Sequence, residues 1–155
     1  MALLILTDSQ PVKRAKCSKP AGALAHIAHD VLKKLSGTFS GSGTFFNPVK
    51  EGGPIGSCGP RESEKSHIVA LNRIQYGDTS KKSHFCGKKV RINYKGKIVF
   101  AIINDACPGC AEGSLDMTPV IFNKLEAPKV GVIPITWCVV GTDGCEDEDA
   151  DDECT

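Results

Sequence analysis

The sequence predicts a mainly β protein folded as a compact barrel. Short runs of β-branched and aromatic residues recur between residues 37 and 140, and turns rich in glycine, proline and asparagine separate them. Helical patterns are few and short. A length of 155 residues suits one domain with tails. We expect an N-terminal segment with an amphipathic helix over residues 1–36, a barrel over residues 37–142 and an acidic tail over residues 143–155.

Each element has its own signal. The first helix is expected over Ala21–Leu35, because its apolar residues share one helical face and Gly37 stops it. A second short helix is expected over Pro119–Leu125, with Thr118 as its cap and Pro119 at its first position. The expected strands and turns are Gly37–Asn47 (strand broken by glycines), His67–Leu71 (strand), Asn72–Asp78 (turn), Val90–Tyr94 and Lys97–Asn104 (strands around a Lys95-Gly96 turn) and Ile133–Val140 (strand).

Eight cysteines in so short a chain indicate a disulfide framework and therefore an oxidising compartment. Zinc is the competing interpretation, because Cys107 and Cys110 have metal-like spacing. No second Cys-x-x-Cys or histidine pair follows at zinc-finger distance, and His26 and His29 have no third ligand nearby. We therefore expect disulfides, no metal and no other cofactor.

Charge divides the chain unevenly. The 19 basic and ten acidic residues before Asp143 give the body a net charge of +9, whereas Asp143–Thr155 holds eight acidic residues and no basic one, a net charge of −8. We expect this tail to be disordered and solvating; the alternative is that it folds back on the basic body as a mimic of an acidic ligand. Ala2–Leu6 is too short for the apolar centre of a signal peptide, so a truncated or absent leader is expected, with Lys13-Arg14 as a candidate processing site. No stretch is long enough to cross a membrane.

The most informative stretch runs from Val99 to Leu125. It places Asp105 at the end of an apolar run and Asp116 just before the short helix, with the Cys107-Pro108-Gly109-Cys110 turn between them. Two carboxyl groups held close together on a stiff frame suit sugar binding or sugar chemistry. Structural roles compete with this interpretation, since either aspartate could cap nearby backbone amides.

Several motifs of the sequence, taken in their order along the chain, resemble those of a known superfamily. The segments Asp105–Cys110, Leu115–Pro119 and Gly131–Trp137, preceded by Gly43–Asn47, Gly56–Gly59 and Val69–Gly77, resemble the expansin, barwin and RlpA-like superfamily, most closely its single-domain fungal members of the loosenin type. The resemblance covers about Gly37–Val140. It implies a six-stranded double-psi β-barrel, secretion, and loosening of cell-wall polysaccharide without hydrolysis.

The resemblance also implies roles for single residues. Asp116 matches the groove aspartate that is the general acid in hydrolytic relatives, Asp105 matches a second groove aspartate, and Thr44 matches a threonine that lines the groove. Asn47 stands where hydrolytic relatives place the base carboxylate, and an amide cannot take a proton from water. We therefore expect little or no hydrolysis, and the classification as an enzyme stays open.

Partners follow from this assignment. Cellulose, chitin or pectin is the expected ligand, and Tyr76, Phe46 and Trp137 are candidates to stack on it, although rings in alternating strands are usually core. The basic body would favour an acidic glycan such as pectin. We expect a monomer that binds neither nucleic acid nor membrane.

Alternatives and pairings remain open. A cysteine-protease inhibitor on the same barrel would use exposed loops such as Pro48–Pro60 or Tyr76–Ser83, a secreted effector would bind a host protein, and a lytic glycosidase is a less favoured case. The resemblance pairs Cys58 with Cys86, and Cys107 is expected to join Cys110. Cys138 would then pair with Cys17 or Cys145, so three connectivities remain for the last four cysteines, Cys154 included.

Overall fold

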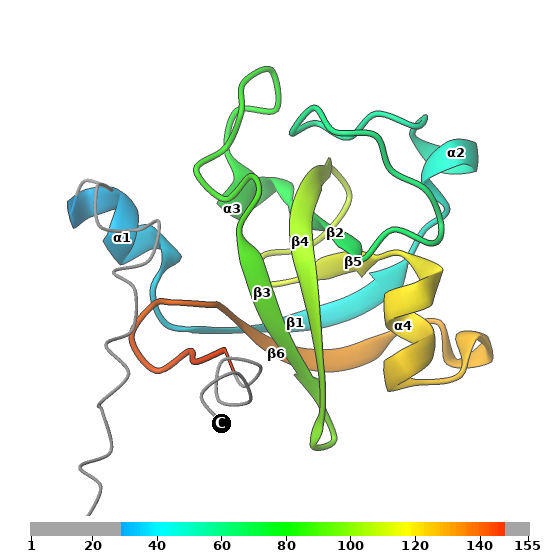
Figure 1. The fold of residues 1–155 in the computed structure, drawn as a ribbon. Helices are drawn as coiled ribbons and strands as arrows, with labels where there is room; N and C mark the ends of the chain where they lie inside the picture. Colours follow the sequence, from blue (N-terminus) through cyan, green and yellow to red (C-terminus); the bar gives the residue numbers. More distant parts are fainter. Residues whose placement is uncertain (1–28, 148–155) are drawn as a thin grey trace, which may run out of the picture.

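The structure, a computed structural model, describes residues 29–147 and shows a closed barrel of six strands (Figure 1). The order around the barrel is β1-β5-β2-β4-β3-β6. Strands β1–β5 and β2–β4 pair in parallel, and the other neighbours are antiparallel. The strands are β1 (Thr38–Phe45), β2 (Ile68–Asn72), β3 (Lys89–Tyr94), β4 (Lys97–Cys107), β5 (Leu115–Met117) and β6 (Ile133–Val139).

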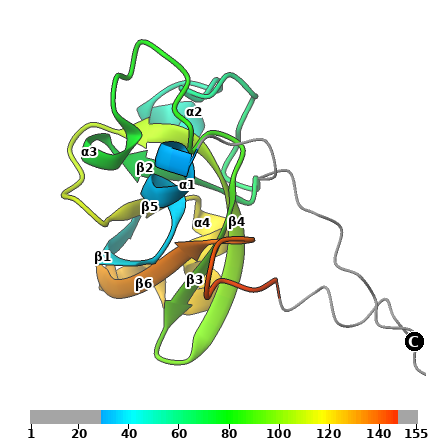
Figure 2. The ribbon, with the colours of Figure 1, turned by 90° about the vertical axis from the view of Figure 1, so that its left-hand side faces the viewer.

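Within residues 29–147, five short helical segments lie around the barrel. They are α1 (His29–Leu35), α2 (Pro48–Glu51), α3 (Arg73–Tyr76), α4 (Pro119–Leu125) and the 3-10 helix η1 (Pro128–Val130). In Figure 1, α2 and α3 lie at the upper end of the barrel with the long loops, and α4 lies against its right-hand side. After a quarter turn, α1 stands in front of the barrel (Figure 2). None of these helices is long and apolar enough to span a membrane.

Alternating burial along the strands builds the core. In β3, for example, Val90, Ile92 and Tyr94 point inward, as a two-residue repeat requires. Helix α4 adds Ile121, Phe122 and Leu125, all with 0% exposure, so the helix packs its apolar face into the same core. The mainly β class and the barrel predicted from the sequence are thus confirmed.

Several local predictions need correction. Asn72–Asp78 is not a simple turn, because its centre forms the helix α3, with the Asn72 side chain accepting a hydrogen bond from the Gln75 amide. Thr118 does not cap α4 with its side chain. Its hydroxyl instead donates to the carbonyls of Ser66 and Ile68, which fastens the start of the helix to β2.

The structure describes only part of the two predicted terminal segments, the N-terminal helix and the acidic tail. Of the helix predicted over Ala21–Leu35, the part from His29 is described; Ala2–Leu6, Lys13-Arg14, Cys17 and His26 lie outside the described residues. The barrel connects directly to residues 143–147 of the predicted tail: Cys145 is 1% exposed and joined to Cys138, and Asp147 accepts hydrogen bonds from the Lys89 ammonium at 2.8 and 2.9 Å. The disorder predicted for residues 143–155 is therefore wrong for residues 143–147, and residues 148–155, Cys154 included, lie outside the described residues.

Candidate functional site

Two aspartates and a threonine meet where β1, β5 and β4 approach one another. The parallel pairing of β1 and β5 sets Thr44 beside Asp116, and Ala70 of β2 lies between Asp116 on β5 and Asp105 on β4. The topology therefore brings together three residues that are far apart in sequence. β5 has only three residues, and so short a stretch shows too little alternation of apolar and polar residues to predict a strand.

A groove of about 570 Å³ opens above these residues. Asp105 and Asp116 both line it, together with Glu51 of α2. Its apolar lining includes Phe45, which is 37% exposed, and Ile55, which is 53% exposed. The two aspartates singled out from the sequence thus line one groove, and Glu51, Phe45 and Ile55 are lining residues that the sequence analysis did not single out.

Asp116 is a half-buried carboxylate with one defined partner. Its Oδ1 accepts a hydrogen bond from the Thr44 hydroxyl at 2.7 Å. Burial raises the pKa of Asp116, the Thr44 hydrogen bond lowers it, and the nearby charges of Glu51 and Asp105 raise it further. A carboxyl group with a raised pKa keeps its proton to a higher pH than usual. Such a group suits both hydrogen bonding to sugar hydroxyls and proton donation. The capping role considered for Asp116 is not what the structure shows.

Asp105 combines a structural contact with a place in the groove. Its Oδ1 accepts hydrogen bonds from the backbone amides of Ser57 and Ala106, both at 2.8 Å. The Ser57 contact fastens the loop between α2 and β2 to the end of β4. The loop is crosslinked beside this point by Cys58–Cys86. Asp105 therefore anchors this wall of the groove, rather than capping the Cys107–Cys110 turn.

Two of the three predicted stacking rings do not face the groove. Trp137 is 1% exposed, and its indole N–H donates to the Gly113 carbonyl at 2.7 Å, so it is a core residue. Tyr76 is 4% exposed, and its hydroxyl donates to the Lys81 carbonyl at 3.2 Å. Phe46 lines the groove but is only 9% exposed, so the accessible ring is that of its neighbour Phe45. Adjacent strand residues face opposite sides, and the sequence does not say which of two neighbouring phenylalanines faces solvent.

Asn47, the amide that follows β1, lies next to two carboxyl groups, those of Glu51 and Glu64. Asn47 donates to Glu64 through its side chain at 2.7 Å and to Glu51 through its backbone amide at 2.6 Å. Glu51, one helical turn further on, is the residue of this segment that lines the groove. Glu51 is thus a third carboxyl group in the groove, which the sequence analysis did not single out, and a four-residue helix places it there.

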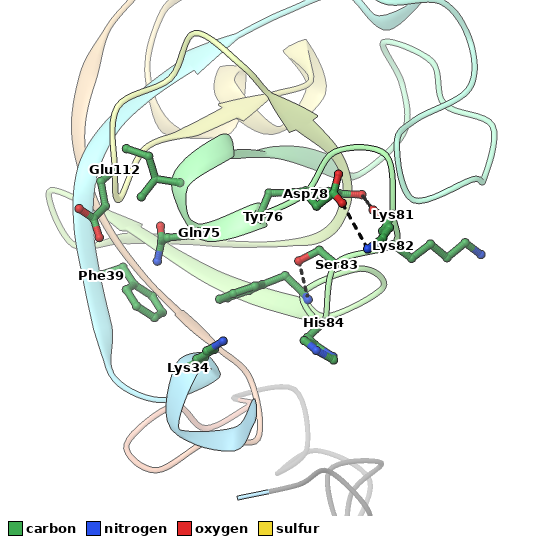
Figure 3. Close-up of a pocket in the computed structure, with 13 residues that line it drawn as sticks. Lys34, Phe39, Gln75, Tyr76, Asp78, Lys81, Lys82, Ser83, His84 and Glu112 are labelled. Atoms are coloured by element: carbon green, nitrogen blue, oxygen red, sulfur yellow. Dashed lines mark hydrogen bonds and ion pairs between the residues drawn. The ribbon is translucent and has the colours of Figure 1, made fainter. Parts of the chain in front are cut away.

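A second pocket, of about 510 Å³, lies between α1, α3 and the loop over residues 77–85 (Figure 3). Phe39, Tyr76 and Phe85 contribute its apolar lining, and Lys34, Lys82 and His84 lie around it. Asp78, an acidic residue that lines the pocket, accepts hydrogen bonds from Ser80 and forms an ion pair with Lys81. Tyr76 thus belongs to this pocket and not to the groove that holds the two aspartates.

The predicted disulfides Cys58–Cys86 and Cys107–Cys110 are present, and Cys138 joins Cys145, which selects one of its two predicted partners. Ligand-type atoms of Cys107, Cys110 and Asp116 lie within 4.8 Å of one another. Both sulfurs are consumed in the disulfide, so they cannot act as thiolate metal ligands in this state.

We expect Cys107–Cys110 to be the first of these three disulfides to open under mild reduction. Both of its cysteines are partly exposed, whereas each of the other disulfides has at least one cysteine that is at most 5% exposed (Cys58, Cys138 and Cys145), and thiolate attack requires access to the sulfur. The four-residue loop that it closes contributes on the order of 2 kcal/mol of entropic stabilisation, so the barrel should stay folded. Limited reduction, alkylation and peptide mass mapping would check this; earlier labelling of Cys58 or Cys138 would contradict it.

Comparison with known proteins places the fold. No family model matches the chain. A curated relative, "Allergen Asp f 7 homolog" of Arthroderma benhamiae, is 33% identical over 97 residues, which cover 55% of this chain and 34% of the relative. The chain thus spans about a third of the length of that relative.

Solved structures of two bacterial proteins are similar. The Streptomyces papain inhibitor superposes with a TM-score of 0.59 at 24% identity, covering 68% of this chain and 96% of the inhibitor. The apo expansin of Clavibacter michiganensis superposes with a TM-score of 0.55 at 25% identity, covering 67% of this chain and 50% of the expansin. A mutant of that expansin in complex with cellohexaose gives the same TM-score at 24% identity. The six-stranded double-psi β-barrel expected from the sequence is thus confirmed, and the chain is similar in fold to this inhibitor and this expansin.

Proposed function

We propose that this protein is a secreted, expansin-like protein that binds cell-wall polysaccharide in the groove and loosens it without hydrolysis. The observation that carries the proposal is the convergence of Asp105 and Asp116, from β4 and β5, on one open groove. The cellohexaose complex of the similar expansin supports it. Three disulfides among residues 29–147 agree with export to an oxidising compartment.

The charge of the groove favours a neutral glycan over pectin. Three of the described residues that line it, Glu51, Asp105 and Asp116, carry carboxyl groups, and none carries a positive charge. A polyuronate would bring further negative charge into this site, and like charges at close range repel. We therefore favour cellulose or chitin, and attribute any pectin binding to the basic outer surface instead.

Affinity for such a polymer should be modest. One ring, Phe45, offers a partly exposed face in the groove, and stacking on several rings is what strengthens binding to flat polymers. A pull-down with insoluble cellulose, chitin and pectin at low and high salt tests this assignment. We expect salt-insensitive retention on a neutral polymer; retention on pectin alone, lost at high salt, would contradict it.

Glycoside hydrolysis is the second candidate, and Glu51 is the observation that favours it. Asp116, with its raised pKa, resembles a general acid, and Glu51 lines the same groove. One Glu51 oxygen already accepts a hydrogen bond from the Asn47 backbone amide, which argues against Glu51 as a free base. Reducing ends released from cellulose or chitin, and lost in Glu51→Gln, would establish hydrolysis in place of loosening.

Protease inhibition or binding of a host protein would use the loops instead of the aspartates. The relevant segments are residues 48–60, which border the groove, and residues 77–83, which border the second pocket. Inhibition of papain by both the wild type and Asp116→Asn, without retention on any polymer, would replace the glycan proposal with this one.

A further inference from the structure

Glu62 is a buried carboxyl group on the loop whose residues Ile55 and Ser57 line the groove. Only 5% of the residue is exposed, although glutamate is seldom buried without a partner. Its Oε2 accepts a hydrogen bond from the Asn104 side-chain amide at 2.6 Å, and its Oε1 is buried without a hydrogen-bond partner. A charged carboxylate in this position would leave one oxygen neither solvated nor paired, which is costly.

The loop that carries Glu62 is closely fitted to the end of β4. Gly56 passes so near that a Cβ there would overlap the Asn104 backbone and the Glu62 carboxyl group. The Cys58 amide donates to the Asn104 carbonyl at 3.0 Å, and the Ser57 amide donates to Asp105 at 2.8 Å. Glu62 therefore shares its surroundings with Asp105, the groove residue that holds this loop in place.

Asp105 is the titratable group that faces Glu62. Burial raises the pKa of Glu62 to about 7; the Asn104 hydrogen bond lowers it, and the neighbouring Asp105 carboxyl group raises it further. The remaining contacts of the Asn104 amide and of this stretch of loop are backbone groups, such as the Pro60 carbonyl. Glu62 thus keeps its proton under mildly acidic conditions, and a protonated carboxyl can donate to a neighbouring carboxylate.

We propose that protonated Glu62 is a positioning residue, which donates its O–H to the Asp105 carboxylate and thereby holds Asp105 and the Ser57 loop in the geometry that binds glycan. The proposal deepens the proposed function and rests on it. When Glu62 loses its proton, two adjacent carboxylates repel, the groove wall loosens and glycan binding weakens. The groove would then be active at mildly acidic pH and weakened above neutrality.

The same interaction changes stability, with a definite sign. The pKa of Glu62 is higher in the folded chain than its ordinary value of 4.5, so the native state holds the proton more tightly than the unfolded state does. The stabilisation is fully present below about pH 4.5 and is lost as the pH rises towards about 7. This effect does not require glycan, so it tests the protonation of buried Glu62 independently, whereas the Ser57 amide reports on the contact with Asp105.

The decisive variant is Glu62→Gln, since glutamine offers a neutral donor at every pH. We expect the affinity of the wild type for cellohexaose, a soluble neutral glycan, to fall about tenfold between pH 5.5 and pH 8.5, the equivalent of one charge-assisted hydrogen bond. Glu62→Gln should bind with a nearly flat pH profile. Glu112→Gln, an exposed glutamate beside the second pocket, is the matched control and should follow the wild type.

Two ligand-free measurements complete the test. The Tm of the wild type should fall over this pH range more steeply than that of Glu62→Gln, and the NMR signal of the Glu62 carboxyl carbon should titrate near pH 7 together with the Ser57 amide. A Glu62 carbon that titrates below pH 5, or equal pH profiles for wild type and Glu62→Gln, would overturn the proposal. If the wild type bound no glycan at any pH while Tm and NMR behaved as expected, the proposed function would fail and the Glu62–Asp105 interaction would stand.

Discussion

Replacing Asp116 with asparagine is expected to lower glycan affinity by more than tenfold without lowering stability. Asparagine keeps an oxygen for the Thr44 hydroxyl but removes the charge that makes hydrogen bonds to sugar hydroxyls strong. Because burial raises the pKa of Asp116, the folded protein disfavours its charged form, so a neutral side chain should be tolerated at pH 7. Affinity for cellohexaose by calorimetry and Tm by thermal melting measure the two effects separately.

A matched change on the partner separates charge from positioning. Thr44→Val has a similar shape but cannot donate to Asp116, and we expect a partial loss of affinity. Binding that survives Asp116→Asn unchanged would remove the aspartate from the site. A drop in Tm as large as the drop in affinity would indicate that Asp116 is mainly structural.

Trp137→Ala is expected to have the largest effect on folding, about 3–5 kcal/mol of unfolding free energy. The indole is almost fully buried, and its ring lies 4.5 Å from that of Phe39 and 6.4 Å from that of Phe85, measured between centroids. Its N–H also holds the Gly113 carbonyl. Gly113 has a φ of 77°, and a Cβ there would overlap the Ser40 carbonyl, so this loop is packed tightly against β1.

Urea denaturation of Trp137→Ala and Trp137→Phe measures this effect. The phenylalanine variant keeps most of the packing and loses the hydrogen bond, so it should lose less stability and, where folded, bind glycan like the wild type. If Trp137→Ala kept its stability but no longer bound glycan, this core assignment would be wrong. The result would support the stacking role that the sequence analysis considered for Trp137.

Much of the barrel could be predicted because its signals are local. The β3 and β4 strands alternate clearly around Lys95 and Gly96, both of which have positive φ, and Pro119 begins α4 as its fixed φ favours. Among the segments that sequence reasoning missed, β5 and α2 have only three and four residues. They form because pairing with β1 and β2 and the turn after β1 impose their geometry, and such tertiary causes leave little trace in a periodic pattern.

The site was predicted in part for the same reason. Asp105 and Asp116 border a recognisable cysteine turn, and the resemblance gave both of them a role. Glu51 and Glu62 lie in segments of mixed polarity where an acidic residue usually faces water. Their importance arises from where α2 and the following loop fold back, which depends on the Cys58–Cys86 crosslink and the Ser57–Asp105 contact.

The most direct test of the central claim is an NMR titration of the full chain with cellohexaose. If a neutral glycan binds in the groove, amide shifts should concentrate at Thr44–Phe46, Ser57, Asp105–Ala106 and Asp116, with no release of shorter sugars during the titration. Shifts concentrated instead around Phe39, Tyr76 and His84 would place the ligand in the second pocket and contradict the account, as would a spectrum that cellohexaose and chitohexaose both leave unchanged.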